Sequence, residues 1–588
     1  MLKLFKRFRL REWLTVLCSL VLIVGQVWLD LTMPDYMSEI TRLVQTPDSV
    51  MGDIWLAGGK MLLCALGSLV LSVMTGFLAA RLAASFSMRL RQDIFDKVEF
   101  FSMEEINRFS TASLITRTTN DVTQIQMLVA IGLQVIIKAP IMAVWAITKI
   151  RAKSWQWTAA TFAAVALALL LIAVAVAFAM PKFKKIQSLT DNLNRVTREN
   201  LTGLRVIRAY NAEGYQEEKF QVANDELTGN NLSANRIMAM MMPGMNLIMN
   251  GLTLAIYWIG AFLIDGIAPT GQAAILERVD VFSNMVVFIS YAMQVVMAFM
   301  MLVMIYILWP RVAVSCRRVL EVLETKPAIR DGSAQAGAPG VRGEVEFRDV
   351  SFRYPDAGGN VLEHVSFRAK QGQTVAFIGA TGSGKSTLVN LVPRFYDATE
   401  GQILVDGVDV REYSQEALRE KLGYVPQRAV LFSGTVASNV AYGREKATEA
   451  QVKRAVEIAQ ASDFVDAMGV GGPIAQGGAN ISGGQKQRLA IARAVCREPE
   501  IYIFDDSFSA LDYRTDRVLR QTLKQETAGV TSLIVAQRIG TIRDADLILV
   551  LDDGKVVGQG THRELLKSCE VYRQIALSQL SKEELEHA

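Results

Sequence analysis

The sequence TVAFIGATGSGKSTLVNLV fills residues 374–392 of this 588-residue chain. It begins with an apolar run typical of a buried strand and ends with a pattern typical of a helix. Between them lies GATGSGKST, residues 379–387, which has the glycine spacing of a P-loop. Glycines there allow backbone N–H groups to surround phosphates, and the helix N-terminus adds positive potential. The stretch therefore predicts a nucleotide-binding domain of the α/β class.

Individual positions of this loop have distinct predicted tasks. Lys385 reaches the β- and γ-phosphates, and the Ser386 hydroxyl can bind Mg²⁺. A second acidic strand, IYIFDD at residues 501–506, reaches Asp505, which is expected to hold Mg²⁺ directly or through other ligands. The predicted cofactors are therefore ATP and Mg²⁺. The ATP-binding residues of the loop are Gly379, Thr381, Gly382, Ser383, Gly384, Lys385, Ser386 and Thr387.

The N-terminal half is apolar in long runs. A helix needs roughly 20 apolar residues to span a bilayer, and six stretches satisfy this. The basic opening, MLKLFKRFRLREW, is typical of a cytoplasmic helix lying on the membrane before the first span. The predicted spans lie near Trp13–Met33, Ile54–Ala80, Val122–Ile147, Trp157–Met180, Ile237–Ile264 and Val281–Trp309.

Two polar segments, at residues 100–122 and 199–220, interrupt the apolar stretches. They follow apolar helices without a strong break, so we expect the spans to continue as helices into the cytoplasm. The turns are expected near Phe109–Ser113 and Ala209–Tyr215. The sequence thus predicts a six-span α-helical domain at residues 1–324, a Gly/Ala/Pro-rich linker at 325–342 and a P-loop nucleotide-binding domain at 343–588.

Composition narrows the class of protein. The chain is 51% hydrophobic, with a mean hydropathy of +0.25. Its net charge of +4 is small for this length, which argues against nucleic acid as a partner. The five cysteines are scattered without CxxC spacing, which disfavours a disulfide framework or a zinc site and fits a reducing interior.

A further motif, NISGGQKQRLAIARA at residues 480–494, places a Ser-Gly-Gly turn before a helix. With Tyr354 in FRYPD, Gln427 in GYVPQ and SALD at residues 509–512, it makes the chain resemble the ATP-binding cassette (ABC) transporters. Six spans ahead of the cassette resemble the exporter type. The resemblance implies that Tyr354 stacks on adenine, that Gln427 senses Mg²⁺ beside Ser386 and Asp505, and that the polar turns are coupling helices.

The same resemblance implies a dimer. Cassettes of this family bind ATP between two copies, and the P-loop of one faces the signature motif of the other. This chain has one P-loop and one signature, so it cannot complete a site alone. The signature residues acting in the partner's site are Ser482, Gly483, Gly484 and Gln485, and Asp512 belongs to the adjoining D-loop.

Two positions depart from the family pattern. The family usually places glutamate where this chain has Asp506, and histidine where it has Gln537. These are the candidate catalytic residues, and both weaken hydrolysis. The stretch GGPIAQGGAN, residues 471–480, also departs from homodimeric members. The chain therefore resembles the degenerate-site subunit of bacterial heterodimeric multidrug exporters, whose expected partner is a second half-transporter with an intact Glu/His site.

The cargo is less constrained by the sequence. Methionines at helical spacing in spans five and six suit a cavity for amphipathic or drug-like compounds, with lipids and peptides as alternatives. Packing between helices or contact with lipid explains the same spacing equally well. An ATP-gated regulatory or lipid-flipping protein with little turnover is the alternative function. The expected location is the bacterial cell membrane, with the nucleotide-binding domain in the cytoplasm. The candidate cavity residues are Met245, Met249, Met293, Met297 and Met300.

Overall fold

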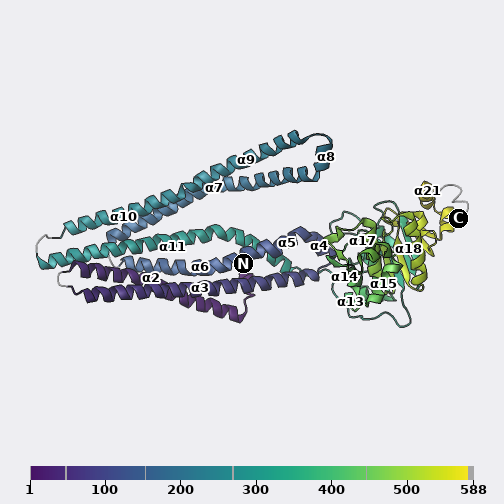
Figure 1. Cartoon of the computed structure of the whole chain (residues 1–588), viewed down its shortest axis with the longest axis horizontal. Coiled ribbons are helices and arrows are strands. Elements are labelled where there is room, and N and C mark those ends of the chain that lie inside the picture. The colour runs from purple at the N-terminus through teal and green to yellow at the C-terminus, as the bar shows by residue number, and fades with distance from the viewer. Residues whose placement is uncertain (1, 47–48, 152–153, 268–270, 445, 580–588) are drawn as a thin grey trace. The chain divides into compact units, whose positions relative to one another are not determined.

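A computed structural model describes residues 2–46, 49–151, 154–267, 271–444 and 446–579 (Figure 1). The chain forms two compact units. Unit 1 comprises Met1–Lys97 and Ala112–Thr325, and unit 2 comprises Val98–Thr111 and Lys326–Ala588. The outermost ends of the predicted domains, residue 1 and residues 580–588, lie outside the described residues.

Six helices of the described residues are long and apolar enough to cross a membrane, which confirms the predicted spans. Their apolar surfaces remain largely exposed, as lipid-facing helices require. Leu63 on α3, for example, is 70% exposed. Prolines within these helices, such as Pro34 and Pro140, are tolerated in membrane helices because neighbouring groups satisfy the freed carbonyls. The spanning helices are α2 (Leu10–Gln45), α3 (Met51–Glu99), α6 (Val122–Arg151), α7 (Trp155–Thr202), α10 (Met241–Asp265) and α11 (Gln272–Glu324).

The polar segments are helical, and the chain turns within them as predicted. Figure 1 shows α7 and α9 side by side, with α8 at the turn between them. The other turn lies at Ser110, whose φ of 58° ends α4. The Ser102 and Glu105 side chains cap the opposite end of α4. The elements are α1 (Leu2–Phe5), α4 (Met103–Phe109), α5 (Thr111–Thr116), the π-helix η1 (Arg117–Asp121), α8 (Leu204–Ala209) and α9 (Glu213–Ala239).

Unit 1 contains an ion pair among its spanning helices. Lys138 Nζ on α6 lies 3.1 Å from Asp30 Oδ2 on α2, and the Ser68 hydroxyl on α3 also donates to Asp30. Charges within membrane-spanning helices are costly unless paired. No periodicity in the sequence indicates this pairing, because Asp30 and Lys138 are 108 residues apart.

Unit 2 contains two main sheets. One has six strands in the order β12-β11-β3-β10-β9-β6, in which only β12 runs antiparallel to its neighbour. The other is antiparallel, in the order β2-β1-β4-β5. The strands are β1 (Val345–Phe352), β2 (Leu362–Ala369), β3 (Thr374–Gly379), β4 (Glu400–Val405), β5 (Val408–Asp409), β6 (Leu422–Val425), β9 (Ile501–Asp505), β10 (Thr531–Val535), β11 (Leu547–Asp552) and β12 (Lys555–Gly560), besides the short pair β7 (Gly434–Thr435) and β8 (Pro473–Ile474).

The order of the strands in the six-stranded sheet brings the segments with the candidate site residues to one edge. The parallel strands β3, β10 and β9 are neighbours, so the segments that follow them emerge at one edge. These segments carry the P-loop, Gln537 and Asp506. The helices of this unit are α12 (Lys385–Leu391), α13 (Gln415–Glu420), α14 (Val436–Val440), η2 (Ala441–Gly443), α15 (Glu449–Ile458), α16 (Ser462–Met468), η3 (Gln476–Gly478), α17 (Gly483–Cys496), α18 (Tyr513–Glu526), α19 (Ile539–Ile542), α20 (His562–Ser568) and α21 (Glu570–Gln579).

Residues 326–342, here called the strap, lie along unit 2. The Gly332 N–H donates to the Tyr413 carbonyl at 2.9 Å, and the Ala334 N–H donates to the Glu412 carbonyl at 2.8 Å. A Cβ at Gly332 would lie only 2.0 Å from the Glu412 carbonyl oxygen, so this close approach requires glycine. These backbone contacts make the strap a part of the folded unit.

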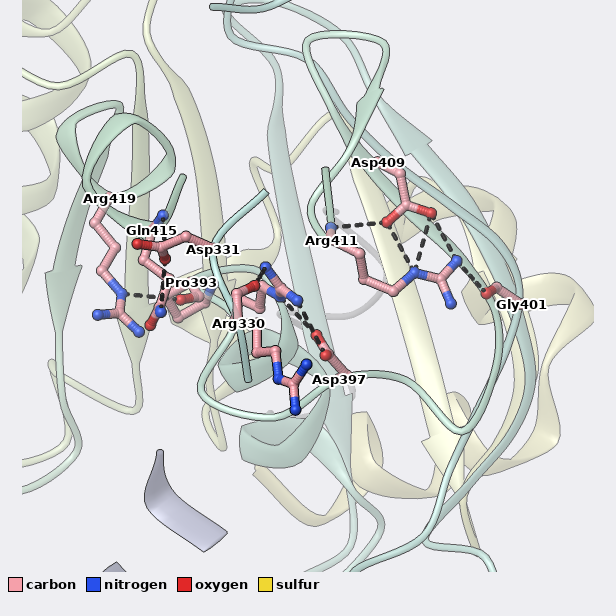
Figure 2. Close-up of polar contacts among 10 residues, drawn as sticks. Arg330, Asp331, Pro393, Asp397, Gly401, Asp409, Arg411, Gln415 and Arg419 are labelled. Atoms are coloured by element: carbon pink, nitrogen blue, oxygen red, sulfur yellow. Dashed lines mark hydrogen bonds and ion pairs between the residues drawn. The ribbon is translucent and has the colours of Figure 1, made fainter. Parts of the chain in front are cut away.

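Side chains fasten the strap further, as Figure 2 shows. Asp331 accepts from the Gln415 side chain at 2.9 Å. The buried Arg394 guanidinium donates to the Arg330 carbonyl at 3.0 Å and pairs with Asp397 at 2.7 Å. Arg394 follows α12, so the strap contacts the turn that ends the P-loop helix.

Candidate active site

The P-loop has the tight geometry that its glycines permit. A Cβ at Gly379 would lie 2.0 Å from the Leu551 carbonyl oxygen, so no side chain fits there. Gly384 caps the N-terminus of α12 with a φ of 94°, a left-handed conformation that favours glycine. The loop therefore turns directly into the helix N-terminus, where N–H groups without helical partners can bind an anion.

Lys385 is the first residue of α12, and its side chain is buried in the loop. Its ammonium donates to the Gly379 carbonyl at 2.9 Å and to the Ala380 carbonyl at 2.6 Å. Burial lowers the pKa of this amine, while Asp506 and Asp505 act in the opposite direction. The amine is thus held within the loop that the sequence assigns to the phosphates.

Ser386 and Asp505 meet directly. The Ser386 hydroxyl donates to Asp505 Oδ1 at 2.7 Å. Burial is the main cause that raises the pKa of Asp505. A hydroxyl and a carboxylate are the hard oxygen ligands that Mg²⁺ prefers. The described residues contain no cluster of three or more His, Cys, Asp or Glu side chains suited to a metal. The two oxygens of the Ser386–Asp505 pair suit Mg²⁺ but do not form a complete ligand set on their own.

Asp506 lies at the centre of the candidate catalytic residues. Its Oδ2 accepts from Gln537 Nε2 at 2.8 Å and from Gln427 Nε2 at 3.4 Å. Its backbone φ is 45°, and its N–H donates to the Val535 carbonyl at 3.1 Å. Burial raises the pKa of the carboxyl, although the hydrogen bonds from Ser509 and Gln427 lower it. The Asp506 carboxylate thus accepts hydrogen bonds from two neutral side-chain amides, those of Gln427 and Gln537.

Tyr354 lies beside the P-loop helix. Its hydroxyl shares a 3.0 Å hydrogen bond with the Thr387 hydroxyl. Its ring meets the Tyr396 ring edge-on, with centroids 5.2 Å apart. The Tyr396 hydroxyl in turn accepts from Asn107 of α4 at 2.9 Å. Sequence reasoning singled out Tyr354 but missed Tyr396 and Asn107, although the aromatic pair Phe395–Tyr396 directly after α12 could have drawn attention to this turn.

The signature motif forms the start of α17. Ser482 and Gln485 cap each other's backbone N–H groups, which leaves the motif an exposed helix N-terminus. A Cβ at Gly483 would meet nothing within 4 Å, and one at Gly484 would make only ordinary contact with Ala510 and Leu511. The fold of this chain therefore gives no steric reason for glycine at residue 483. Asp512 caps α18 through the Thr515 N–H at 3.0 Å.

The predicted cavity methionines occupy different environments. Met245 is buried in the core of unit 1, and Met249 and Met300 pack partly against that core. Met297 is 49% exposed, and Met293 is half-buried. A pocket between α6 and α11 includes none of them and is lined instead by Met127, Leu128, Ile131, Gly132 and Met304, among others.

Two models of known protein families together match most of the chain. The family model described as the ABC transporter transmembrane region matches residues 14–299, and the one described as ABC transporter matches residues 362–509. The fold resembles a bacterial Atm1-family ABC exporter solved with ATP bound. That structure has a TM-score of 0.78 and 25% identity, with 97% of this chain and 98% of that chain covered.

Curated relatives match over most of their length. An uncharacterized ABC transporter ATP-binding protein of Mycobacterium tuberculosis is 41% identical, with 89% of this chain and 87% of that protein covered. An uncharacterized ABC transporter ATP-binding protein of Bacillus subtilis is 34% identical, with 90% of each covered. An ATP-dependent lipid A-core flippase of Aromatoleum aromaticum is 32% identical, with 86% and 82% covered. The chain therefore belongs to the ABC transporter family, as an exporter half-transporter with six membrane-spanning helices and a cytoplasmic nucleotide-binding domain.

Proposed function

We propose that this chain is the degenerate-site half of a heterodimeric ATP-driven exporter. One observation carries the proposal: the Asp506 carboxylate is bound by the amides of Gln427 and Gln537. A glutamine amide donates a hydrogen bond but can neither take up a proton nor carry a charge. These two amides therefore hold the carboxylate in place but cannot themselves take up the proton of an attacking water.

The length of Asp506 adds to this weakness. Aspartate is one methylene shorter than glutamate, which retracts the carboxylate by about 1 Å, and such a misplacement can cost on the order of 10²-fold in rate. The loss of a general base costs about 10²–10⁴-fold. The binding parts are retained, since Lys385 lies within the P-loop and Ser386 pairs with Asp505. The site is thus suited to hold ATP and Mg²⁺ and to hydrolyse slowly.

The signature motif is proposed to serve the partner. Gly483 has open space where a Cβ would stand, so the glycine leaves room for a group from outside this chain. A phosphate approaching the exposed N-terminus of α17 is such a group. A partner with glutamate and histidine in its own site would then have one fully active site, completed by this chain.

An amphipathic lipid is the cargo class that we favour. Relatives named lipid A-core flippases support it, at 32% identity over most of the chain. Drug-like amphipathic compounds share this chemistry, and methionine side chains can adapt to either. The flipping of lipids and the export of drugs would then be two uses of one ATP-driven cycle.

The experiment compares the full-length chain with a double variant in lipid nanodiscs. The wild-type chain alone should bind ATP-Mg²⁺ and release phosphate very slowly. Asp506→Glu with Gln537→His should raise the rate by about 10²-fold or more, because both catalytic groups return. Lys385→Ala in the double variant is the control and should remove the gain. Sustained hydrolysis by the wild-type chain at the rate of the double variant would overturn the proposal.

A further inference from the structure

A hydrogen-bonded clamp joins the C-terminal helix α21 to the loop that carries Gln537. The Gln579 side chain, at the end of α21, meets the backbone of this loop twice. Its Oε1 accepts from the Ile539 N–H at 2.8 Å, and its Nε2 donates to the Gln537 carbonyl at 2.8 Å. The two bonds flank Arg538, so they hold the loop on both sides of that residue.

Both bonds together require a side-chain amide. One backbone partner is a donor and the other is an acceptor, whereas a carboxylate only accepts and an ammonium only donates. Glutamate at residue 579 would have the same size and would still accept from the Ile539 N–H. It would, however, point a negative oxygen at the Gln537 carbonyl.

The helix behind the clamp is firmly packed. Tyr572 and Ala576 of α21 are fully buried, with 0% exposure. The Tyr572 hydroxyl is hydrogen-bonded to His562 Nδ1 at 2.6 Å. Gln579 itself is exposed, so it extends from a fixed helix to the surface of the loop.

The clamp reaches Asp506 through Gln537. Gln579 holds the Gln537 backbone, and the Gln537 side chain donates to Asp506 Oδ2 at 2.8 Å. We propose that Gln579 is a positioning residue that fixes Gln537 against Asp506 and thereby prolongs the residence of ATP at this chain's site. This inference rests on the proposed function, in which the site retains ATP.

The first test measures nucleotide release from the full-length chain in nanodiscs, with a fluorescent ATP analogue and Mg²⁺. Gln579→Ala and Gln579→Glu should both speed release by about three- to tenfold, the effect of losing one or two ordinary hydrogen bonds. Gln574→Ala is the matched control, because Gln574 lies on the same helix and contacts Glu570 within it. It should leave release unchanged. Equal release from all four proteins would overturn the inference.

The second test separates the two bonds by hydrogen exchange of the peptide that contains Ile539. Its N–H should exchange faster in Gln579→Ala but remain protected in Gln579→Glu, which keeps the acceptor. A packing role would instead make the isosteric Glu variant resemble wild type in release as well. Exchange does not depend on hydrolysis. Rapid turnover by the wild-type chain would therefore defeat the proposed function, whereas unchanged exchange in Gln579→Ala would defeat the clamp alone.

Discussion

The ion pair between Lys138 and Asp30 gives a quantitative prediction about unit 1. Lys138→Met keeps an apolar stem of similar length, and among the described residues it leaves the Asp30 carboxylate with the neutral Ser68 hydroxyl as its donor. Removing one partner of a fully buried pair costs about 3–5 kcal/mol. The Lys138 and Asp30 side chains are only 21% and 20% exposed and lie among spanning helices, where water does not screen the remaining charge. We therefore expect a cost near the lower end of this range, roughly 3 kcal/mol.

The matched variant is Lys138→Met with Asp30→Asn. It removes both charges and leaves an amide oxygen to accept from Ser68. We expect this double variant to lie within about 1 kcal/mol of wild type, because replacing both members of a buried pair is often nearly neutral. The assay is thermal unfolding of the three proteins in one detergent, followed by circular dichroism. If the single variant unfolds no earlier than the double variant, Lys138 does not compensate the charge of Asp30 in the folded state.

Two further predictions concern the nucleotide-binding domain. In a heterodimer with a Glu/His partner, Ser482→Arg should lower steady-state ATPase activity by about 10²-fold or more, because it obstructs the N–H donors offered to the phosphate in the partner's site. Asp506→Asn should change this activity only modestly. Equal losses in a phosphate-release assay would refute the assignment of strong and weak sites. Burial raises the pKa of Asp505, so the ionised carboxylate destabilises the nucleotide-free fold. This penalty is complete above the raised pKa of the folded state, shrinks as the pH falls below it, and is gone below the carboxyl's ordinary pKa in the unfolded chain. Asp505→Asn should therefore raise the unfolding temperature of the nucleotide-free protein at neutral pH. It should also weaken Mg²⁺-dependent ATP binding by about 10- to 100-fold. An unfolding temperature that does not rise would contradict the idea that the buried, ionised carboxylate destabilises the fold.

The sequence predicted those parts of the structure that have local signals. The six spans follow from runs of apolar residues, and the P-loop follows from a strand, a glycine-rich turn and a helix that adjoin in the chain. Asp505 and Asp506 could be placed because they stand at the end of an apolar strand. Gln537 was placed beside them only through the resemblance to the ABC transporters.

Contacts between distant segments could not be predicted in this way. Asn107 and Tyr396 are 289 residues apart, and Lys138 and Asp30 are 108 apart. Their meeting depends on how helices and turns pack, which no periodicity encodes. Gln579 similarly resembles any polar residue at the end of a surface helix until the loop beside it is known. The Gly/Ala/Pro-rich strap likewise has the composition of a flexible connection.

The path of the chain through unit 2 has a practical consequence. The chain enters this unit at Val98, leaves it after Thr111 and returns at Lys326. Helix α4 is therefore an internal piece of the unit: Glu105 Oε1 accepts from the Ala328 N–H at 2.8 Å, and Asn107 donates to Tyr396.

A fragment that starts at Lys326 would lack both contacts and would expose the Tyr396 hydroxyl beside the ring of Tyr354. Nucleotide affinities measured on such an excised cassette would describe a domain with a missing segment. A faithful soluble version would have to supply residues 98–111 as a tethered or added peptide.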